Sequence, residues 1–81
     1  MKSKIRNEVV SVLVGVFDKV PRETFDTKVG IESFPEWDSL ANFNVLMAVE
    51  EKFTIQFEVD EMAELKDIDS ICSAVEKHLK N

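Results

Sequence analysis

The sequence predicts a small all-α protein, a four-helix bundle of three longer helices and one short helix, with a long loop between the first and second helices. Apolar residues recur every three or four positions in segments that begin near residues 5, 39 and 68, which is the period of a helix that buries one face. The single cysteine, Cys72, cannot form an internal disulfide bond, so the 81 residues have to fold around a hydrophobic core. A chain of this length predicts one domain, residues 1–81.

The first helix is predicted over residues 5–20 and is expected to end at Pro21, because proline disrupts a helix interior. Gly15 lies inside this helix at a cost of up to about 1 kcal/mol relative to alanine, which predicts that another helix packs closely there. Residues 21–38 show neither a helical nor an alternating pattern, which predicts the long loop. Its apolar side chains are expected to hold it against the core: Phe25, Val29, Ile31, Phe34 and Trp37.

The second helix is predicted to begin near Asp38 or Ser39, both favourable N-cap residues, and to end near Phe53. The residues expected on its inner side are Leu40, Phe43, Leu46, Met47, Val49 and Phe53. Residues 54–59 alternate in polarity like a strand, but the chain offers no second strand to pair with them, so an extended connector is predicted.

A short third helix is predicted around residues 62–65, and Asp67 is expected to cap a last helix. The apolar stripe of this last helix consists of Ile68, Ile71, Cys72, Val75 and Leu79, and its C-terminal end carries Lys77, His78 and Lys80. Cys72 is therefore expected to be a buried core thiol, because a reactive cysteine would need an exposed, electropositive setting.

The charge of the chain is negative and unevenly placed. The formal net charge is −6, and residues 36–64 contain one Lys/Arg against eight Asp/Glu, whereas residues 1–35 give +1 and residues 65–81 balance. This disfavours nucleic acid and anionic membranes as partners, since phosphate recognition needs a positive surface, and it favours basic proteins. No apolar run approaches the roughly 20 residues that span a bilayer and no signal-peptide pattern is present, so we expect a cytoplasmic protein. We also expect a monomer.

Asp38-Ser39-Leu40 opens the predicted second helix, which closes with Glu-Glu-Lys-Phe at residues 50–53 and is followed by Ile55. This pattern resembles the acyl carrier proteins, in which Asp-Ser-Leu opens a helix that ends in Glu-Glu-x-Phe with an Ile two residues on. The resemblance extends without gaps through the last predicted helix, while the first 35 residues match mainly in pattern.

The resemblance implies that Ser39 is the attachment point of 4′-phosphopantetheine, which a phosphopantetheinyl transferase takes from coenzyme A, and that Asp38 and Leu40 belong to the attachment site. It also implies a free-standing protein that is not itself an enzyme and carries acyl groups as thioesters in a fatty-acid, polyketide or other specialised pathway. The residues support this independently, because a phosphate at a helix N-terminus meets unpaired backbone N–H groups and is stabilised by roughly 0.3 to 1 kcal/mol. The charge of Asp38 opposes this slightly, but Asp38 can cap the helix and, by resemblance, serve recognition by the transferase.

The resemblance further implies that acidic residues meet Arg and Lys patches on acyl-transferring, condensing or modifying enzymes. The residues expected to bind these partners are Glu50, Glu51, Glu58, Asp60, Glu61, Glu64, Met47 and Trp37. Ala41 and Asn44 depart from the family, which often has acidic residues at these positions, so specialised partners are expected. Trp37 before Asp-Ser-Leu looks more like the carriers of secondary-metabolite or cell-surface pathways, and it is expected to contact the arm or a partner, or to pin the loop.

Simpler interpretations stay open for several of these residues. Ser39 can be a plain N-cap, and the acidic run can be a solvated surface. The residues that could line an expandable cavity for a carried acyl chain, or simply form the core, are Phe43, Met47, Phe57 and Met62. A triad of Ser39, His78 and an Asp is disfavoured, because no oxyanion-hole glycines follow the serine. The sequence has no zinc or EF-hand spacing, so no metal is expected.

Two other functions compete with an acyl carrier. A peptidyl or aminoacyl carrier shares the bundle and the serine, but such carriers usually have His or a similar residue before the serine and a less acidic second helix. An unmodified acidic helical module that binds a basic partner would need no prosthetic group. Modification of Ser39 separates this module from both kinds of carrier.

Overall fold

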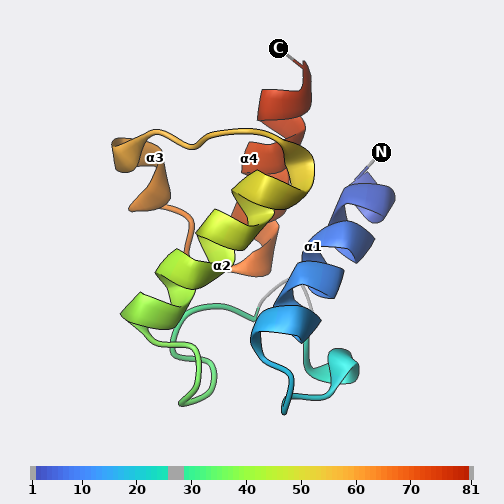
Figure 1. Cartoon of the computed structure of the whole chain (residues 1–81), viewed down its shortest axis with the longest axis vertical. Coiled ribbons are helices and arrows are strands. Elements are labelled where there is room, and N and C mark those ends of the chain that lie inside the picture. Colours follow the sequence, from blue (N-terminus) through green and yellow to red (C-terminus); the bar gives the residue numbers. More distant parts are fainter. Residues whose placement is uncertain (1, 26–28, 81) are drawn as a thin grey trace.

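The computed structural model describes residues 2–25 and 29–80, which form a small all-α fold (Figure 1). The elements are α1 (Lys2–Val16), the 3-10 turn η1 (Arg22–Thr24), α2 (Ser39–Phe53), α3 (Val59–Met62) and α4 (Ile68–Lys80). Helix α1 runs opposite to α2 and α4 and packs against both. The predicted all-α class, with three longer helices and one short helix, is confirmed for the described residues, which contain no β-strand.

Helix α1 ends at Val16, four residues earlier than predicted. The N–H of Phe17 still donates to Leu13 O at 2.7 Å, but Val20 then donates to Phe17 O at 3.0 Å and closes a tight turn ahead of Pro21. The turn leaves Phe17 buried at the end of the helix, where its ring meets aromatic rings from the loop. Packing of Phe17 against the loop therefore takes the place of the last helical turn that the sequence predicts for residues 17–20.

The packing predicted at Gly15 is wrong. Gly15 is exposed, and a Cβ built on it would have no atom within 4 Å outside its own helix and chain neighbours. The buried residues of α1, such as Val9 and Leu13, lie on the opposite side of the helix, because two positions along a helix turn the side chain by about 200°.

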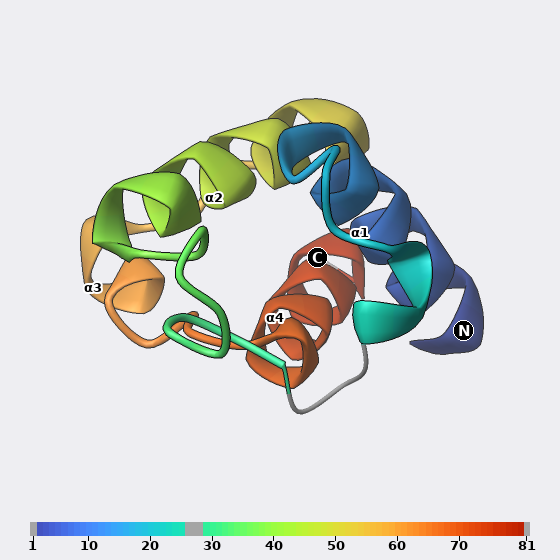
Figure 2. The ribbon, with the colours of Figure 1, turned by 90° about the horizontal axis from the view of Figure 1, so that it is seen from below.

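The loop between α1 and α2 is held to the core by aromatic side chains, as predicted. The rings of Phe17 and Trp37 lie 5.4 Å apart, those of Phe17 and Phe34 also 5.4 Å, and Phe25 is buried beside them. Figure 2 shows the loop crossing the end of the molecule between the start of α2 and the start of α4. The aromatic cluster therefore fixes the segment that leads directly into Ser39.

The same loop is joined to the start of α4 by backbone hydrogen bonds. Ile31 N donates to Lys66 O at 2.7 Å, and Ile68 N donates to Val29 O at 2.9 Å. A Cβ on Gly30 would lie 2.2 Å from Lys66 O, so only glycine allows the two backbones to approach this closely.

Helix α2 has the predicted bounds, and Leu46 and Val49 face the core as predicted, but the rest of the buried face differs from the prediction. Its buried residues are Asn42, Val45, Leu46 and Val49. Three residues expected on the inner side are instead exposed: Leu40 at 72 %, Phe43 at 51 % and Met47 at 49 %. The prediction for these three residues was wrong because α2 is apolar on two opposite sides, and the side that is buried includes the polar residue Asn42.

The C-terminal elements follow the sequence closely. Residues 55–58 form an extended connector, and α3 begins at Val59, three residues earlier than predicted. Asp67 caps α4 as predicted, since its Oδ1 accepts a hydrogen bond from Ser70 N at 2.8 Å. Cys72 is buried in the core, also as predicted.

Candidate functional site

Ser39 is the first residue of α2, and its side chain is exposed. The N-cap is Asp38, whose backbone is extended and whose Oδ1 accepts a hydrogen bond from Ala41 N at 2.9 Å. Capping by Ser39 itself, one of the simpler interpretations, is therefore wrong. The neighbouring aspartate does the capping, and the serine hydroxyl has no hydrogen-bond partner in the described parts of the chain.

Two backbone N–H groups at the start of α2 stay available to a ligand. The side chain of Asp38 accepts a hydrogen bond from the N–H of Ala41. The backbone carbonyl of Asp38 accepts from Asn42 N at 2.9 Å. The N–H groups of Ser39 and Leu40 have no acceptor among residues 2–25 and 29–80. They lie at the positive end of the helix dipole, so an anion attached to Ser39 would meet two free donors.

A buried polar chain lies directly beneath Ser39. Trp37 Nε1 donates to Asn42 Oδ1 at 2.9 Å, and Asn42 Nδ2 donates to the backbone oxygen of Leu65 at 3.0 Å. Both side chains are buried, and no buried side-chain nitrogen or oxygen of the described residues lacks a partner. These two hydrogen bonds join the loop before Ser39, helix α2 and the turn before α4 into one unit.

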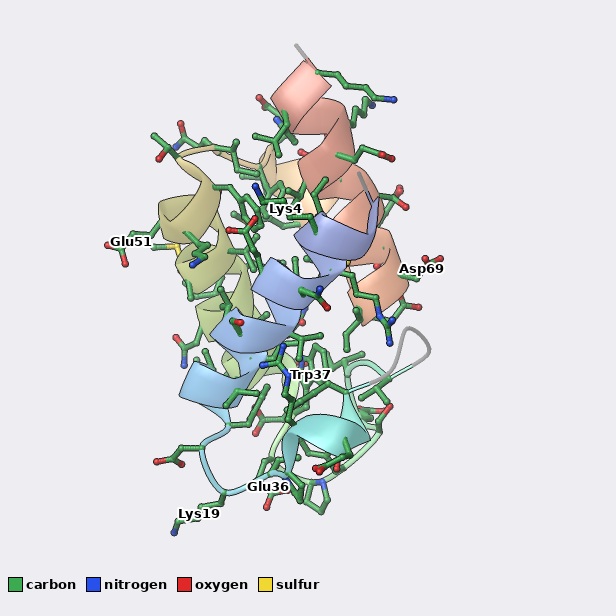
Figure 3. All side chains as sticks on the ribbon, turned by 90° about the vertical axis from the view of Figure 1, so that its right-hand side faces the viewer. Lys4, Lys19, Glu36, Trp37, Glu51 and Asp69 are labelled. Carbon is green, nitrogen blue, oxygen red and sulfur yellow. The ribbon has the colours of Figure 1, made fainter. Side chains whose placement is uncertain are left out.

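For Trp37 one of the expected roles is confirmed and another is wrong, and Asn42 is a site residue that the sequence did not indicate. The sequence predicts that Trp37 contacts the arm or a partner, or pins the loop; it is 0 % exposed, so it pins the loop and offers no surface to the arm or to a partner (Figure 3). The predicted partner contact of Trp37 is thus corrected by its burial. Asn42 was not predicted as a site residue, and a polar residue three positions after Ser39 within an otherwise apolar face was the only signal.

The exposed apolar residues of α2 form a stripe that begins beside Ser39. Leu40, Phe43 and Met47 are spaced by three and four positions and therefore share one face of the helix. We call this the outer face of α2. Met47, expected to bind a partner, lies on it, and neither Met47 nor Phe43 lines an enclosed cavity.

The acidic residues expected to bind partners divide into two groups. Four are exposed: Glu51, Glu58, Asp60 and Glu64. Glu50 and Glu61 are half-buried and hold the fold together, as Glu50 Oε2 accepts from Phe57 N at 2.7 Å and Glu61 lies 2.9 Å from His78 Nε2. Figure 3 shows Glu51 projecting away from the helices. The acidic surface available to a partner is thus formed mainly by the exposed four.

Glu61 links α3 to α4. Its two carboxylate oxygens lie 2.9 and 3.0 Å from His78 Nε2, and Glu58 N donates to Oε1 at 3.2 Å as part of a capping box. Partial burial raises the pKa of Glu61, but the hydrogen bonds of His78 and Glu58 and the positive charges of His78 and Lys77 outweigh it and hold the pKa below the ordinary 4.5.

A serine–histidine catalytic arrangement is not formed. Ser39 opens α2 at one end of the molecule, whereas α4 ends at the other (Figure 1), and His78 is paired with Glu61 near that end. The part of the chain that the structure describes brings together no group of three or more His, Cys, Asp or Glu side chains that could hold a metal ion. No helix within it is long and apolar enough to cross a membrane.

Comparison with models of known protein families, with curated proteins and with solved structures gives no match in any of the three cases.

Proposed function

We propose that the protein is an acyl carrier protein of the four-helix type, with 4′-phosphopantetheine attached to Ser39. The observation that carries the proposal is the position of Ser39: within Asp-Ser-Leu, exposed at the first residue of α2, with the capping role taken by Asp38. The free N–H groups of Ser39 and Leu40 suit the phosphodiester that such an attachment would create.

The attachment needs no catalytic group on this chain. Ser39 Oγ attacks the phosphorus of coenzyme A that bears the pantetheine, the bond from that phosphorus to 3′,5′-adenosine bisphosphate breaks, and the hydroxyl proton passes to a base of the transferase. The arm then supplies a thiol that holds an acyl group as a thioester. The chain itself presents the hydroxyl in a fixed place, because Asp38 caps the helix and buried Trp37 anchors the preceding loop.

Partner enzymes are expected to meet the surface next to Ser39. The outer face of α2 offers Leu40 and Met47, and the exposed acids Glu51, Asp60 and Glu64 add negative charge. Opposite charges raise association rates without a large hydrophobic interface, which suits partners that have to bind, react and leave. The partners we propose are a phosphopantetheinyl transferase and acyl-transferring, condensing or modifying enzymes with basic patches, in a cytoplasmic fatty-acid, polyketide or other specialised pathway.

Incubation with coenzyme A and a broad-specificity phosphopantetheinyl transferase, followed by mass measurement of the intact protein, tests the proposal. The wild-type chain and Ser73→Ala, which removes another exposed serine, should both gain one phosphopantetheine, whereas Ser39→Ala should gain none. A gain by Ser39→Ala, or none by the wild type with several transferases, would contradict the proposal.

Loading of the holo protein separates an acyl carrier from a peptidyl or aminoacyl carrier. Acyl donors and their enzymes should load the arm, and aminoacyl donors should not. An unmodified interaction module is favoured by one observation, since the outer face of α2 is exposed while Ser39 is unmodified. Full partner binding and full cellular activity of Ser39→Ala would support that module.

A further inference from the structure

The interior beneath Ser39 is closed by polar contacts. Asn42 lies about one helical turn after Ser39 and is buried, with its amide bonded to Trp37 Nε1 and to the oxygen of Leu65. An acyl chain that entered the bundle here would have to separate α2 from the turn before α4. That movement would break the hydrogen bond between Asn42 Nδ2 and Leu65 O and leave these two buried polar groups without partners, which is unfavourable in a region that excludes water.

The outer face of α2 leads from the same serine in the other direction. Leu40 directly follows Ser39, and Phe43 and Met47 continue the apolar stripe over roughly 12 Å of helix, at 1.5 Å per residue. The stripe leads to an open surface hollow of about 740 Å³, which is lined by the apolar residues Met47, Ala48 and Ile55 and by the polar residues Glu50, Glu51, Thr54 and Gln56. A group tethered at Ser39 can therefore follow an apolar path to the apolar part of this hollow, formed by Met47, Ala48 and Ile55, without opening the core.

We propose that the carried acyl group stays outside the helical bundle and rests on the outer face of α2, in the hollow formed by Met47, Ala48 and Ile55. This inference rests on the proposed attachment at Ser39. The tether keeps the cargo at high local concentration, so a modest apolar surface is enough to hold it. The carboxylates of Glu50 and Glu51 beside the hollow favour an uncharged acyl group over one that ends in a carboxylate.

The test uses the whole chain loaded from octanoyl-coenzyme A by the transferase, with the octanoyl methyl group labelled with carbon-13. Nuclear Overhauser contacts of this methyl group should be seen to the methyl groups of Met47 and Ile55. They should not be seen to Val45 or Val49, which lie fully buried on the inner side of α2. Met47→Gln should abolish the contacts to Ile55, whereas Val59→Gln, which changes an exposed residue away from the stripe, should leave them unchanged.

Fluorescence gives a second and independent readout. Trp37 is the only tryptophan of the chain and forms part of the closed interior, so its emission should be the same in the holo and octanoyl forms. Contacts to Val45 or Val49, contacts to neither set of residues, or a change in Trp37 emission on acylation would overturn the inference. Loading is checked by mass first, so a chain that gains no arm contradicts the proposed function as well, whereas a loaded chain with inner contacts contradicts only this inference.

Discussion

Asn42 is the residue on which the geometry around Ser39 most depends. A buried amide that satisfies both Trp37 and the backbone of Leu65 fixes the loop, the helix and the following turn relative to one another. Its apolar neighbours on α2 could be exchanged for other apolar residues of similar volume at small cost, whereas Asn42 has no apolar substitute.

Asn42→Leu should lower the free energy of unfolding by about 1–3 kcal/mol or more, because Trp37 Nε1 and Leu65 O lose their partner inside the protein. Asn44→Leu makes the same chemical change two positions along, at an exposed site, and should stay within about 0.5 kcal/mol of the wild type. Urea unfolding at equilibrium measures both, and equal stabilities of the two variants would contradict this role of Asn42.

The sequence predicts Ser39 as the site, but it predicts the side of α2 that faces the core only in part, since Leu46 and Val49 are buried as predicted. Leu40, Phe43 and Met47 have helical spacing, as do the buried Val45 and Val49, so the apolar pattern alone allows either orientation. The deciding contacts come from Trp37 and Leu65, 5 and 23 positions away from Asn42, and no local pattern reports them. The start of α2 was predictable because its N-cap, Asp38, is a local signal.

At the scale of the elements, contacts between the loop and α4 position the start of α2. Gly30 lies where its backbone almost touches Lys66 and Asp67, while Gly15 lies on an open side of α1. The end of α1 could not be predicted from Pro21 alone, because Phe17 leaves the helix early to join the aromatic cluster formed with the loop.

Alanine substitutions at the two glycines should act in opposite directions. Gly30→Ala should destabilise the protein, because the new Cβ would lie 2.2 Å from Lys66 O and the two backbones would have to separate. Gly15→Ala should stabilise it by about 0.5–1 kcal/mol, since the site is open and alanine favours the helix. Thermal unfolding of both variants checks this, and a stabilising Gly30→Ala would contradict the close approach.

The link between α3 and α4 predicts a dependence of stability on pH. The pKa of Glu61 is lower in the folded chain than its ordinary value, so the folded state binds fewer protons than the unfolded state between those two values. The contribution of Glu61 is therefore complete above the ordinary value and is lost as the pH falls through the folded value. For a partly exposed pair it should be on the order of 1 kcal/mol or less.

This is tested by unfolding the wild type and Glu61→Gln in urea from about pH 6 to about pH 3, a range that includes the ordinary glutamate pKa. The difference in stability between wild type and variant should shrink towards the acid end. Glu64→Gln, an exposed neighbour, should show no such trend. A difference that grows as the pH falls would have the wrong sign for a lowered pKa.

At the scale of the whole molecule, the negative charge is concentrated in the segment that includes α2 and α3. The transferase is expected to associate more slowly with a variant in which Glu51, Asp60 and Glu64 become amides, by roughly tenfold at low salt. The control is a triple variant with the same change in net charge but outside the acidic segment, among the first 25 residues: Glu8→Gln, Asp18→Asn and Glu23→Gln. Stopped-flow kinetics at two salt concentrations would contradict local steering if both triple variants slowed equally.

The central claim is that one hydroxyl, at the first residue of α2, receives the prosthetic arm. Its most direct test is to digest the chain after treatment with coenzyme A and transferase, and to locate the added mass by fragmentation of the peptides. The added 4′-phosphopantetheine is predicted on Ser39 alone. Its appearance on any other side chain, or its absence under conditions in which a known carrier is fully modified, would contradict the account.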